Sequence, residues 1–355
     1  MFTRDTDPRG ARITRCMTGC GPQAPSSRVR IIDMSIEPVP LQDSSAAHAA
    51  GEPTRTHVLA AGDLLAVFEP MRGMVCVSLK HRGEEILSRV ASNPAASFDE
   101  VVSGIALRYP FANRVRNGRY AFDGRCVQLD PASSWLSTDV NGTPSDGVRP
   151  SRLDWRVVEA SDRRLRARIS WTRDELLQVF PFPHDVELSA TLDGLGLTIA
   201  VAVLANAEAR VPVSFGLNPR LTLPGLPREK WRLSMPAMAG IVLDEQLLPV
   251  GERTPLPPYD GRLADLDFDH GFALPTTGAT MSLEGNGRRI SIDFADHFPY
   301  AWIEASSAVD SVTLAPMTAA PDALRSHEDL PVVVAGERFT ATCRIRVEST
   351  SNSLH

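Results

Sequence analysis

The segment between Arg108 and Gly124, RYPFANRVRNGRYAFDG, places several polar side chains where the pattern otherwise indicates strands joined by a tight turn. Polar residues in strands cost stability unless they face water or line a site. Arg114 has a planar fork of donors that can orient an anionic or hydroxylated ligand, and Asn113 can hydrogen-bond a ligand or a neighbouring strand. Tyr109 can stack on a ligand ring or pack in the core. The segment predicts the location of a binding site.

Two dipeptides in this segment predict how it folds. Asn117-Gly118 and Asp123-Gly124 each suit a two-residue type I′ turn, because Asn, Asp and Gly tolerate positive φ. Together they predict a meander that runs through residues 119–122 into residues 125–129.

The rest of the chain alternates apolar and polar residues with period two, which is typical of half-buried strands. Helical signals are confined to residues 93–96 and 321–324. Many short strands separated by turn signals predict an all-β fold, a large antiparallel sandwich. The expected strands lie at residues 58–60, 64–68, 74–79, 155–159, 164–171, 185–192, 197–205, 211–217, 241–244, 280–283, 289–294, 300–304, 311–315 and 337–347.

Composition limits the classes of partner. The chain has 355 residues, 43% of them hydrophobic, and a net charge of −6. This charge argues against nucleic acid or an anionic membrane surface as an obligate partner, and no run of about 18 apolar residues is available to span a bilayer. Five scattered Cys are typical of reduced thiols, so we predict a cytoplasmic protein.

We expect one folded domain with two loose ends. Residues 1–51 are rich in Arg, Pro, Ser and Ala and are predicted to be a flexible leader, residues 52–348 form the sandwich, and residues 349–355 are a polar tail. Cys16 and Cys20 lack a second ligand pair, so we predict no metal site. We predict no cofactor either, because no phosphate-binding glycine loop is present.

A series of short motifs, in order along the chain, resembles the aldose 1-epimerase (galactose mutarotase) family. The resemblance spans about Thr56 to Val347 and begins with the Asn113-Arg114 pair and its Asn-Gly turn. The further motifs are DWRVVE at 154–159, FPFP at 180–183, FGLNP at 215–219, DHGF at 269–272, PMTAAPDAL at 316–324 and GERFT at 336–340.

The resemblance implies a galactose mutarotase-like β-supersandwich with an open cleft that holds a sugar. It also implies the interconversion of α and β anomers by ring opening. In the family, a Glu is the base that takes the proton of the anomeric hydroxyl, and a His is the acid that protonates the ring oxygen. A second His and an Asp hold the sugar.

The chain departs from this pattern at three polar positions. Asp146 replaces the His of the family's His-Gly pair, Asn218 replaces the His that precedes a proline, and Ala315 replaces the base Glu. Of the family's polar set, only Asn113, Arg114 and Asp269 match. Loss of one positioned acid or base costs about 10²–10⁴ in rate, so ordinary mutarotase activity is not expected.

A different set of residues could still do acid–base chemistry. Asp146 and Asp269 are the candidate catalytic pair, because two carboxyl groups in a partly dry site can split their pKa values. Asn218 can hydrogen-bond a hydroxyl group, and Arg220 can add a second positive charge. Glu304 precedes Ala315 by one strand and could replace the missing base in space.

Each of these residues also has an ordinary structural interpretation. Asp146-Gly147 is a common turn dipeptide, and Asp269 ends an acidic run that could simply be solvated. His270 would face away from Asp269 on a strand, and Glu304 could be an ordinary surface residue.

The sequence therefore leaves three functions open. One is a divergent isomerase that acts on a sugar or sugar-like hydroxylated ligand. The second is a carbohydrate-binding or regulatory protein without turnover, and the third is a lyase or cyclase with a non-sugar substrate. The expected partner is the small ligand itself, and a homodimer remains an open alternative.

Overall fold

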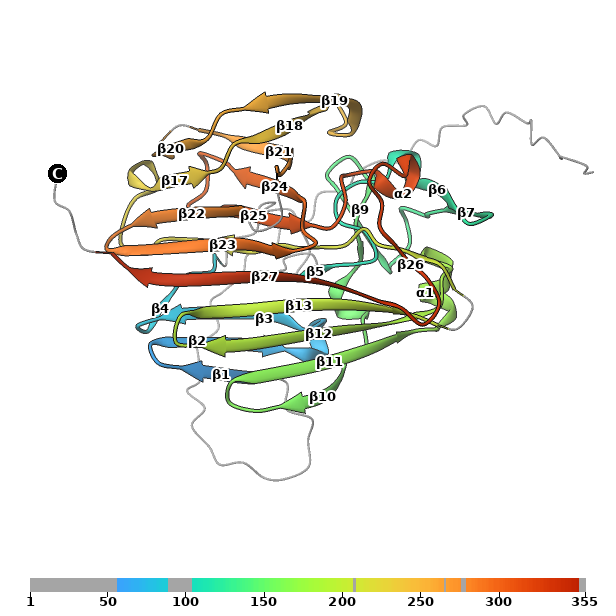
Figure 1. Ribbon diagram of the computed structural model, residues 1–355, viewed down its shortest axis with the longest axis horizontal. Coiled ribbons are helices and arrows are strands. Elements are labelled where there is room, and N and C mark those ends of the chain that lie inside the picture. The colour runs from blue at the N-terminus through green and yellow to red at the C-terminus, as the bar shows by residue number, and fades with distance from the viewer. Residues whose placement is uncertain (1–55, 89–103, 207–208, 265, 276–278, 351–355) are drawn as a thin grey trace, which may run out of the picture. The chain divides into compact units, whose positions relative to one another are not determined.

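Period-two alternation produces the long strands of a nine-stranded antiparallel sheet. In β12 (His184–Asp193), buried residues alternate with partly exposed ones along almost the whole strand, as expected when one face packs on a core and the other meets water. The sheet runs β10 (Arg156–Ala160), β11 (Arg164–Trp171), β12, β13 (Gly196–Ala205), β27 (Arg338–Ser349), β23 (Arg288–Asp296), β22 (Ala279–Gly285), β17 (Arg232–Met235) and β20 (Tyr259–Arg262) (Figure 1).

A second large sheet has eight strands. Its order is β19 (Pro249–Leu256), β18 (Met238–Leu243), β21 (Phe268–Ala273), β24 (Tyr300–Ala305), β25 (Val312–Met317), β15 (Gly216–Leu217) and β5 (Leu107–Arg108), with β16 (Arg220–Leu221) also paired to β25. This sheet carries most of the residues that the sequence singles out.

Shorter elements complete the structure, which is a computed structural model that describes residues 56–88, 104–206, 209–264, 266–275 and 279–350. All of these lie in one compact unit, Pro53–His355. One smaller sheet has four strands, in the order β1 (His57–Ala61), β2 (Leu64–Glu69), β3 (Val75–His81) and β4 (Glu84–Glu85). The others are pairs of strands: β6 (Arg119–Phe122) with β7 (Arg125–Gln128), β8 (Leu136–Thr138) with β9 (Pro144–Val148), and β14 (Val211–Pro212) with β26 (Val332–Val333). The helices are α1 (Asp174–Val179) and α2 (Ala323–Ser326), with 3₁₀ turns η1 (Pro70–Arg72), η2 (Arg116–Gly118), η3 (Pro150–Arg152) and η4 (Arg228–Lys230).

One hydrophobic cluster joins the inward faces of the sheets. Leu188 and Ile345 come from the nine-stranded sheet, Ile303 and Leu314 from the eight-stranded sheet, and Phe68 from the sheet β1–β4. Two sheets that share a core in this way form a β-sandwich, which confirms the predicted fold class. None of the helices in the described ranges is long and apolar enough to cross a membrane.

The turn predictions are partly right. Asp123-Gly124 links β6 to β7 with positive φ at both residues, as predicted. The hairpin predicted at Asn117-Gly118 is wrong: both residues have positive φ, but they belong to the 3₁₀ turn η2. The reason is that the chain before this turn pairs with other partners; Arg114, for example, bridges Ser145. The turn predicted at residues 93–96 and the leader lie outside the described residues.

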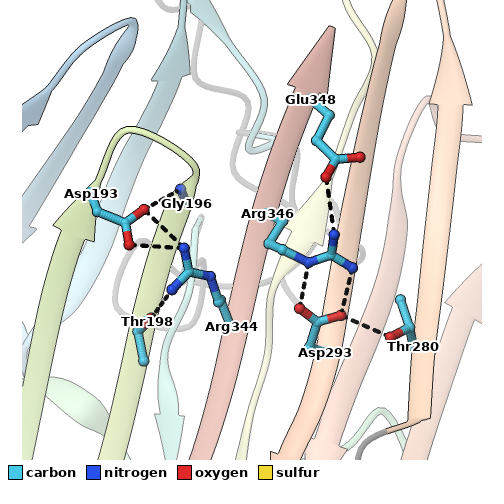
Figure 2. A network of polar contacts seen from close by, with 8 residues as sticks. All are labelled: Asp193, Gly196, Thr198, Thr280, Asp293, Arg344, Arg346 and Glu348. Atoms are coloured by element: carbon cyan, nitrogen blue, oxygen red, sulfur yellow. Dashed lines mark hydrogen bonds and ion pairs between the residues drawn. The ribbon is translucent and has the colours of Figure 1, made fainter. Parts of the chain in front are cut away.

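Two arginines on β27 bind carboxylates of other strands in the nine-stranded sheet: Arg344 binds one at the end of β12, and Arg346 binds one on β23 (Figure 2). Arg344 donates two hydrogen bonds to the carboxylate of Asp193, at 2.9 and 2.8 Å, and Arg346 binds both oxygens of Asp293, at 2.6 and 3.0 Å. Burial pushes the pKa of Asp293 up, but the bonds from Arg346 and Thr280 outweigh it and hold that pKa below its usual value. Two-point arginine–carboxylate pairs fix geometry as well as charge.

We predict that Arg346→Met lowers the free energy of unfolding by about 1–2 kcal/mol at pH 7, because a half-buried, two-point ion pair is lost. The depressed pKa of Asp293 stabilises the fold above the ordinary aspartate pKa, so the difference should shrink as the pH falls through the folded-state value. Urea denaturation measures both effects. Arg289→Met, which removes a more exposed pair with Glu284, is the control and should cost less.

His184 is a fully buried histidine in the aromatic part of the core. Its Nδ1–H donates to the carbonyl of Phe182 at 2.5 Å, its Nε2 accepts the hydroxyl proton of Tyr109, and its ring stacks on Trp171. Burial lowers the pKa of His184 to about 4, with smaller opposing effects from Phe182 and Asp185. The imidazole is therefore neutral in the folded protein at pH 7.

This shift makes the fold sensitive to acid. The folded-state pKa of His184 lies below the ordinary value of 6.5, so the unfolded chain takes up a proton at higher pH than the folded protein. This difference should lower the free energy of unfolding by about 3 kcal/mol as the pH falls from about 6.5 to 4. Denaturant titrations across this range should show a shallower decline for His184→Gln. His297→Gln, at an exposed position, controls for loss of a histidine. Parallel curves for wild type and His184→Gln would contradict the prediction.

Candidate functional site

Register places four polar residues in one row across the eight-stranded sheet. Asp269 on β21 lies opposite Glu304 on β24, Glu304 lies opposite Thr313 on β25, and Thr313 lies opposite Arg220 on β16. Residues directly opposite each other in a ladder point to the same face of a sheet. That face is the one turned away from the main core, because the alternate residues Ile303, Leu314 and Val312 belong to the core. We call these four residues the polar row.

The next row holds the replaced family positions. Trp302 lies opposite Ala315. Gly216 pairs with Met317 and Arg220 with Thr313, so the same register places Asn218 opposite Ala315. Trp302 is 4% exposed and Ala315 is 8% exposed, within a small apolar cluster that also contains Ala112 and Tyr300. This second row is therefore largely enclosed by protein.

Glu304 is the centre of the polar row. Its Oε2 accepts hydrogen bonds from Nη2 of Arg220 at 3.3 Å and from the hydroxyl of Thr313 at 3.4 Å. Its side chain is 41% exposed, whereas that of Arg220 is 10% exposed. The pKa of Glu304 is raised, mainly by burial. The positive charges of Arg220 and Arg108 lower this pKa, whereas the negative charges of Asp269 and Asp146 raise it further. A carboxyl that is surrounded by other charges and still meets water is a candidate for proton transfer.

Arg114 is held rigidly beside Trp302 of the second row. Its Nε donates to Asp139 at 2.8 Å, one Nη donates to the side chain of Asn113 at 3.2 Å, and its guanidinium lies 5.7 Å from the centre of a Trp302 ring. Asp139 also accepts two backbone N–H groups of the loop that follows it, at 2.9 Å each. Arg114 is therefore pre-oriented, which limits the entropy lost when it binds a ligand.

Asp146 reaches the site from β9. Its Oδ1 accepts the backbone N–H of Asn113 at 3.0 Å, and its Oδ2 lies 3.8 Å from Nε of Arg108. Nε of Arg108 is buried and has no hydrogen-bond partner in the described part of the chain. Asp146 thus takes part in the local backbone structure, as the turn interpretation requires, and also faces an arginine of the site.

Gly147 fixes the position of Asp146. It has φ of 72°, and a Cβ at this residue would lie 2.1 Å from the carbonyl oxygen of Tyr109, with which Gly147 forms a β-bridge. Only glycine permits both this backbone conformation and this close approach.

We predict that Gly147→Ala lowers the free energy of unfolding by about 2 kcal/mol or more, since it combines backbone strain with a steric clash. Gly142→Ala is the matched control in the loop that precedes β9, because Gly142 also has positive φ but nothing lies within 4 Å of its Cβ position; it should cost about 1 kcal/mol. Thermal or urea unfolding measures both variants. Equal losses would show that the contact with Tyr109 does not matter.

The structure brings together most of the residues that the sequence proposes. Asp146 lies against Asn113, and Asp269 accepts the indole N–H of Trp302 at 3.0 Å. Asn218 and Arg220 lie on the same face of the sheet as Asp269 by register. His270 packs on Phe272, which fits its expected structural role.

Tyr109 does not belong to this group. It is 3% exposed, its ring packs on Trp171 and Phe180, and its hydroxyl binds His184. The expectation that Tyr109 contacts ligand is therefore corrected: it is a core residue. The preceding residue, Arg108 on β5, faces the site instead. It lies opposite Gly216, which is on the same face of the sheet as Asn218 and Arg220.

Two residues of the candidate site are not marked by any motif. Arg108 lies in the polar segment but matches no family position, and Glu304 has the simple interpretation of a surface residue on a strand. The available signal for Glu304 was its spacing: it is two residues after Trp302, so it shares a face with it. Among the residues that the structure describes, no group of three or more His, Cys, Asp or Glu could hold a metal ion.

Solved structures with the same fold are similar over most of this chain. A putative aldose 1-epimerase from Escherichia coli K12 has 23% identity and a TM-score of 0.66, covering 83% of this chain and 99% of its own. A galactose mutarotase-like protein from Clostridium acetobutylicum has 17% identity and a TM-score of 0.70, covering 82% and 95%. An aldose epimerase homologue from C. elegans has 15% identity and a TM-score of 0.66, covering 83% and 99%. At such identities these likenesses establish the fold.

The antiparallel sandwich and its polar face thus belong to the class of galactose mutarotase-like β proteins. The sequence pattern described as Aldose 1-epimerase matches residues 75–346, which is more than half of the chain. The protein is therefore a member of the aldose 1-epimerase family. No curated protein matches the chain.

Proposed function

We propose that the protein binds a sugar or sugar-like hydroxylated ligand on the polar face of the eight-stranded sheet and interconverts its anomers by ring opening. The observation that carries this proposal is the polar row, in which Asp269, Glu304, Thr313 and Arg220 come from four strands and share one face. Membership of the aldose 1-epimerase family supports the choice of ligand.

In this proposal the ligand is held by neutral and positive groups. Arg114 is fixed by Asp139 and Asn113, and its other N–H groups can bind hydroxyl groups. Asn218 offers an amide to the same ligand, and Arg220, which pairs with Glu304, adds a second positive charge to the site. Hydrogen bonding by several polar groups of this kind suits a polyhydroxylated ring better than an apolar one.

Proton transfer is assigned to carboxyl groups on the same face. Asp146 and Asp269 are the candidates proposed from the sequence, and both lie close enough to Glu304 to raise its pKa. Interacting carboxyls separate their pKa values, so one can act as an acid while another acts as a base at the same pH. This replaces the imidazole and glutamate chemistry implied by the family resemblance.

A binding protein without turnover is the second candidate. It is favoured by the enclosed second row, where Asn218 and Ala315 face each other and neither can exchange a proton in the working pH range. In that case the ligand would be held by the same residues, and the carboxyl groups would accept hydrogen bonds from its hydroxyls.

Magnetisation-exchange NMR on D-glucose, D-galactose and D-xylose separates these functions. We expect wild-type protein to accelerate exchange between anomers and Asp269→Asn to slow it by about 10²–10⁴. Saturation-transfer difference spectra should show that this variant still binds, because an asparagine can still accept the indole N–H of Trp302. Asp267→Asn, two residues earlier in the same acidic run, is the control and should behave as wild type.

Saturation transfer without anomer exchange would support the binding protein instead. Absence of both signals with all three sugars would contradict the proposed function.

A further inference from the structure

The two rows on the polar face differ in their access to water, and this difference decides where proton transfer can take place. In the second row, Trp302 and Ala315 are nearly buried, and neither Ala315 nor Asn218 can titrate. In the polar row, Asp269 is exposed and Glu304 is 41% exposed. Ala315 stands at the position of the family's base. The titratable groups that a ligand can reach therefore lie in the adjacent row, which is two residues away along each strand.

Within the polar row, Asp269 and Glu304 form a pair. They are directly opposite each other on β21 and β24, so their Cβ atoms are about 5 Å apart. The two oxygens that exchange protons in ring opening, the anomeric hydroxyl and the ring oxygen, are bonded to the same carbon. Two neighbouring carboxyls on one face of a sheet can reach both oxygens together.

We propose that Glu304 protonates the ring oxygen and Asp269 accepts the proton of the anomeric hydroxyl, with Arg220 as a positioning residue for Glu304. This inference rests on the proposed function. As the anomeric O–H bond breaks, its electron pair forms the carbonyl of the open aldehyde. The bond between the anomeric carbon and the ring oxygen breaks, its electron pair stays on that oxygen, and Glu304 supplies the proton. Rotation of the aldehyde and reversal of these steps give the other anomer, with both carboxyls restored.

The charges around Glu304 support its role as the acid. Burial is the largest effect and raises the pKa of Glu304. Asp269 on β21 and Asp146 on β9 also raise this pKa, whereas Arg220 on β16 and Arg108 on β5 lower it. A raised pKa keeps Glu304 protonated at higher pH than an ordinary glutamate. Asp269, directly opposite Glu304 in the ladder, is the neighbouring carboxyl placed to accept the proton in the same step.

Arg220 and Thr313 hold the carboxyl in place. Both bind the same oxygen, Oε2, at 3.3 and 3.4 Å, which leaves Oε1 for the ligand. Thr313 is 2% exposed and Arg220 is 8% exposed, so the supporting groups lie beneath the carboxyl rather than in the way of a ligand.

The test is the rate and pH profile of anomer exchange with the sugar that wild type turns over fastest among D-glucose, D-galactose and D-xylose. Glu304→Gln should lower the rate by about 10²–10⁴, and Glu304→Asp should recover part of it. Glu284→Gln, which alters a Glu paired with an Arg on the opposite large sheet, should leave the rate unchanged. Thermal unfolding checks that all variants fold.

The pH profile separates a proton donor from a structural residue. Activity should fall as the pH rises through the pKa of Glu304, because the acid must be protonated. Arg220→Gln removes a charge that lowers this pKa and should move the alkaline limb to higher pH. Asp146→Asn removes a charge that raises it and should move the limb to lower pH.

The outcomes are distinct. If Glu304→Gln stays within about threefold of wild type while Asp146→Asn or Asp269→Asn loses the rate, the assignment of Glu304 is overturned and the proposed function stands. If the alkaline limb does not move in Arg220→Gln and Asp146→Asn, Glu304 is not the titrating acid. If wild type accelerates none of the sugars, the proposed function fails and the Glu304 assignment fails with it.

Discussion

Strand register is the constraint on which the site depends. On the eight-stranded sheet, the residues with one parity pack into the common core, so the residues with the other parity must face away from it. A shift of one residue on β24 would place Glu304 in the core and Ile303 on the polar face, at a large cost in free energy. The apolar packing of Ile303, Leu314 and Val312 therefore also fixes which carboxyls meet.

The charged groups are arranged so that few of them are left without a partner. Arg114 pairs with Asp139, Arg220 with Glu304, and Arg116 with Asp244 and Asp322. Buried charges need such partners, because desolvation otherwise exceeds what their attraction returns. In the described ranges, Nε of Arg108 is buried without a hydrogen bond, as are the Nε atoms of Arg166, Arg168 and Arg228. Arg108 and Glu304, whose pKa is raised, lie on the same face of the eight-stranded sheet. Perturbed ionisable groups of this kind cluster at functional sites.

The fold could be predicted from the sequence because alternation, turn dipeptides and motif order all indicated it. The hairpin at Asp123-Gly124 follows from local chemistry and is present. The one at Asn117-Gly118 is absent, because positive φ at two residues does not determine which strands flank them. Residues of the site were predictable where a motif marks them, as with Asn113, Arg114 and Asp146.

The remaining site residues depend on non-local pairing. Tyr109 appeared to be a ligand contact because of its neighbours in the chain, yet its hydroxyl is used by His184, which is 75 residues away in sequence. Glu304 gains its surroundings from β5, β9, β16 and β21, and no local pattern indicates that these strands converge on it. Composition and spacing identify polar residues, whereas the register between distant strands decides which of them share a face.

The position of β27 also has a consequence for how the chain is made. This strand, Arg338–Ser349, lies between β13 and β23 in the nine-stranded sheet, and β10–β13 have no ladder to β23, β22, β17 or β20 except through it. During synthesis the two parts of the sheet must wait, each with an open edge, until residues 338–349 leave the ribosome. Open edges can pair with other chains, so the partly formed sheet exposes two sites for aggregation until β27 inserts between them.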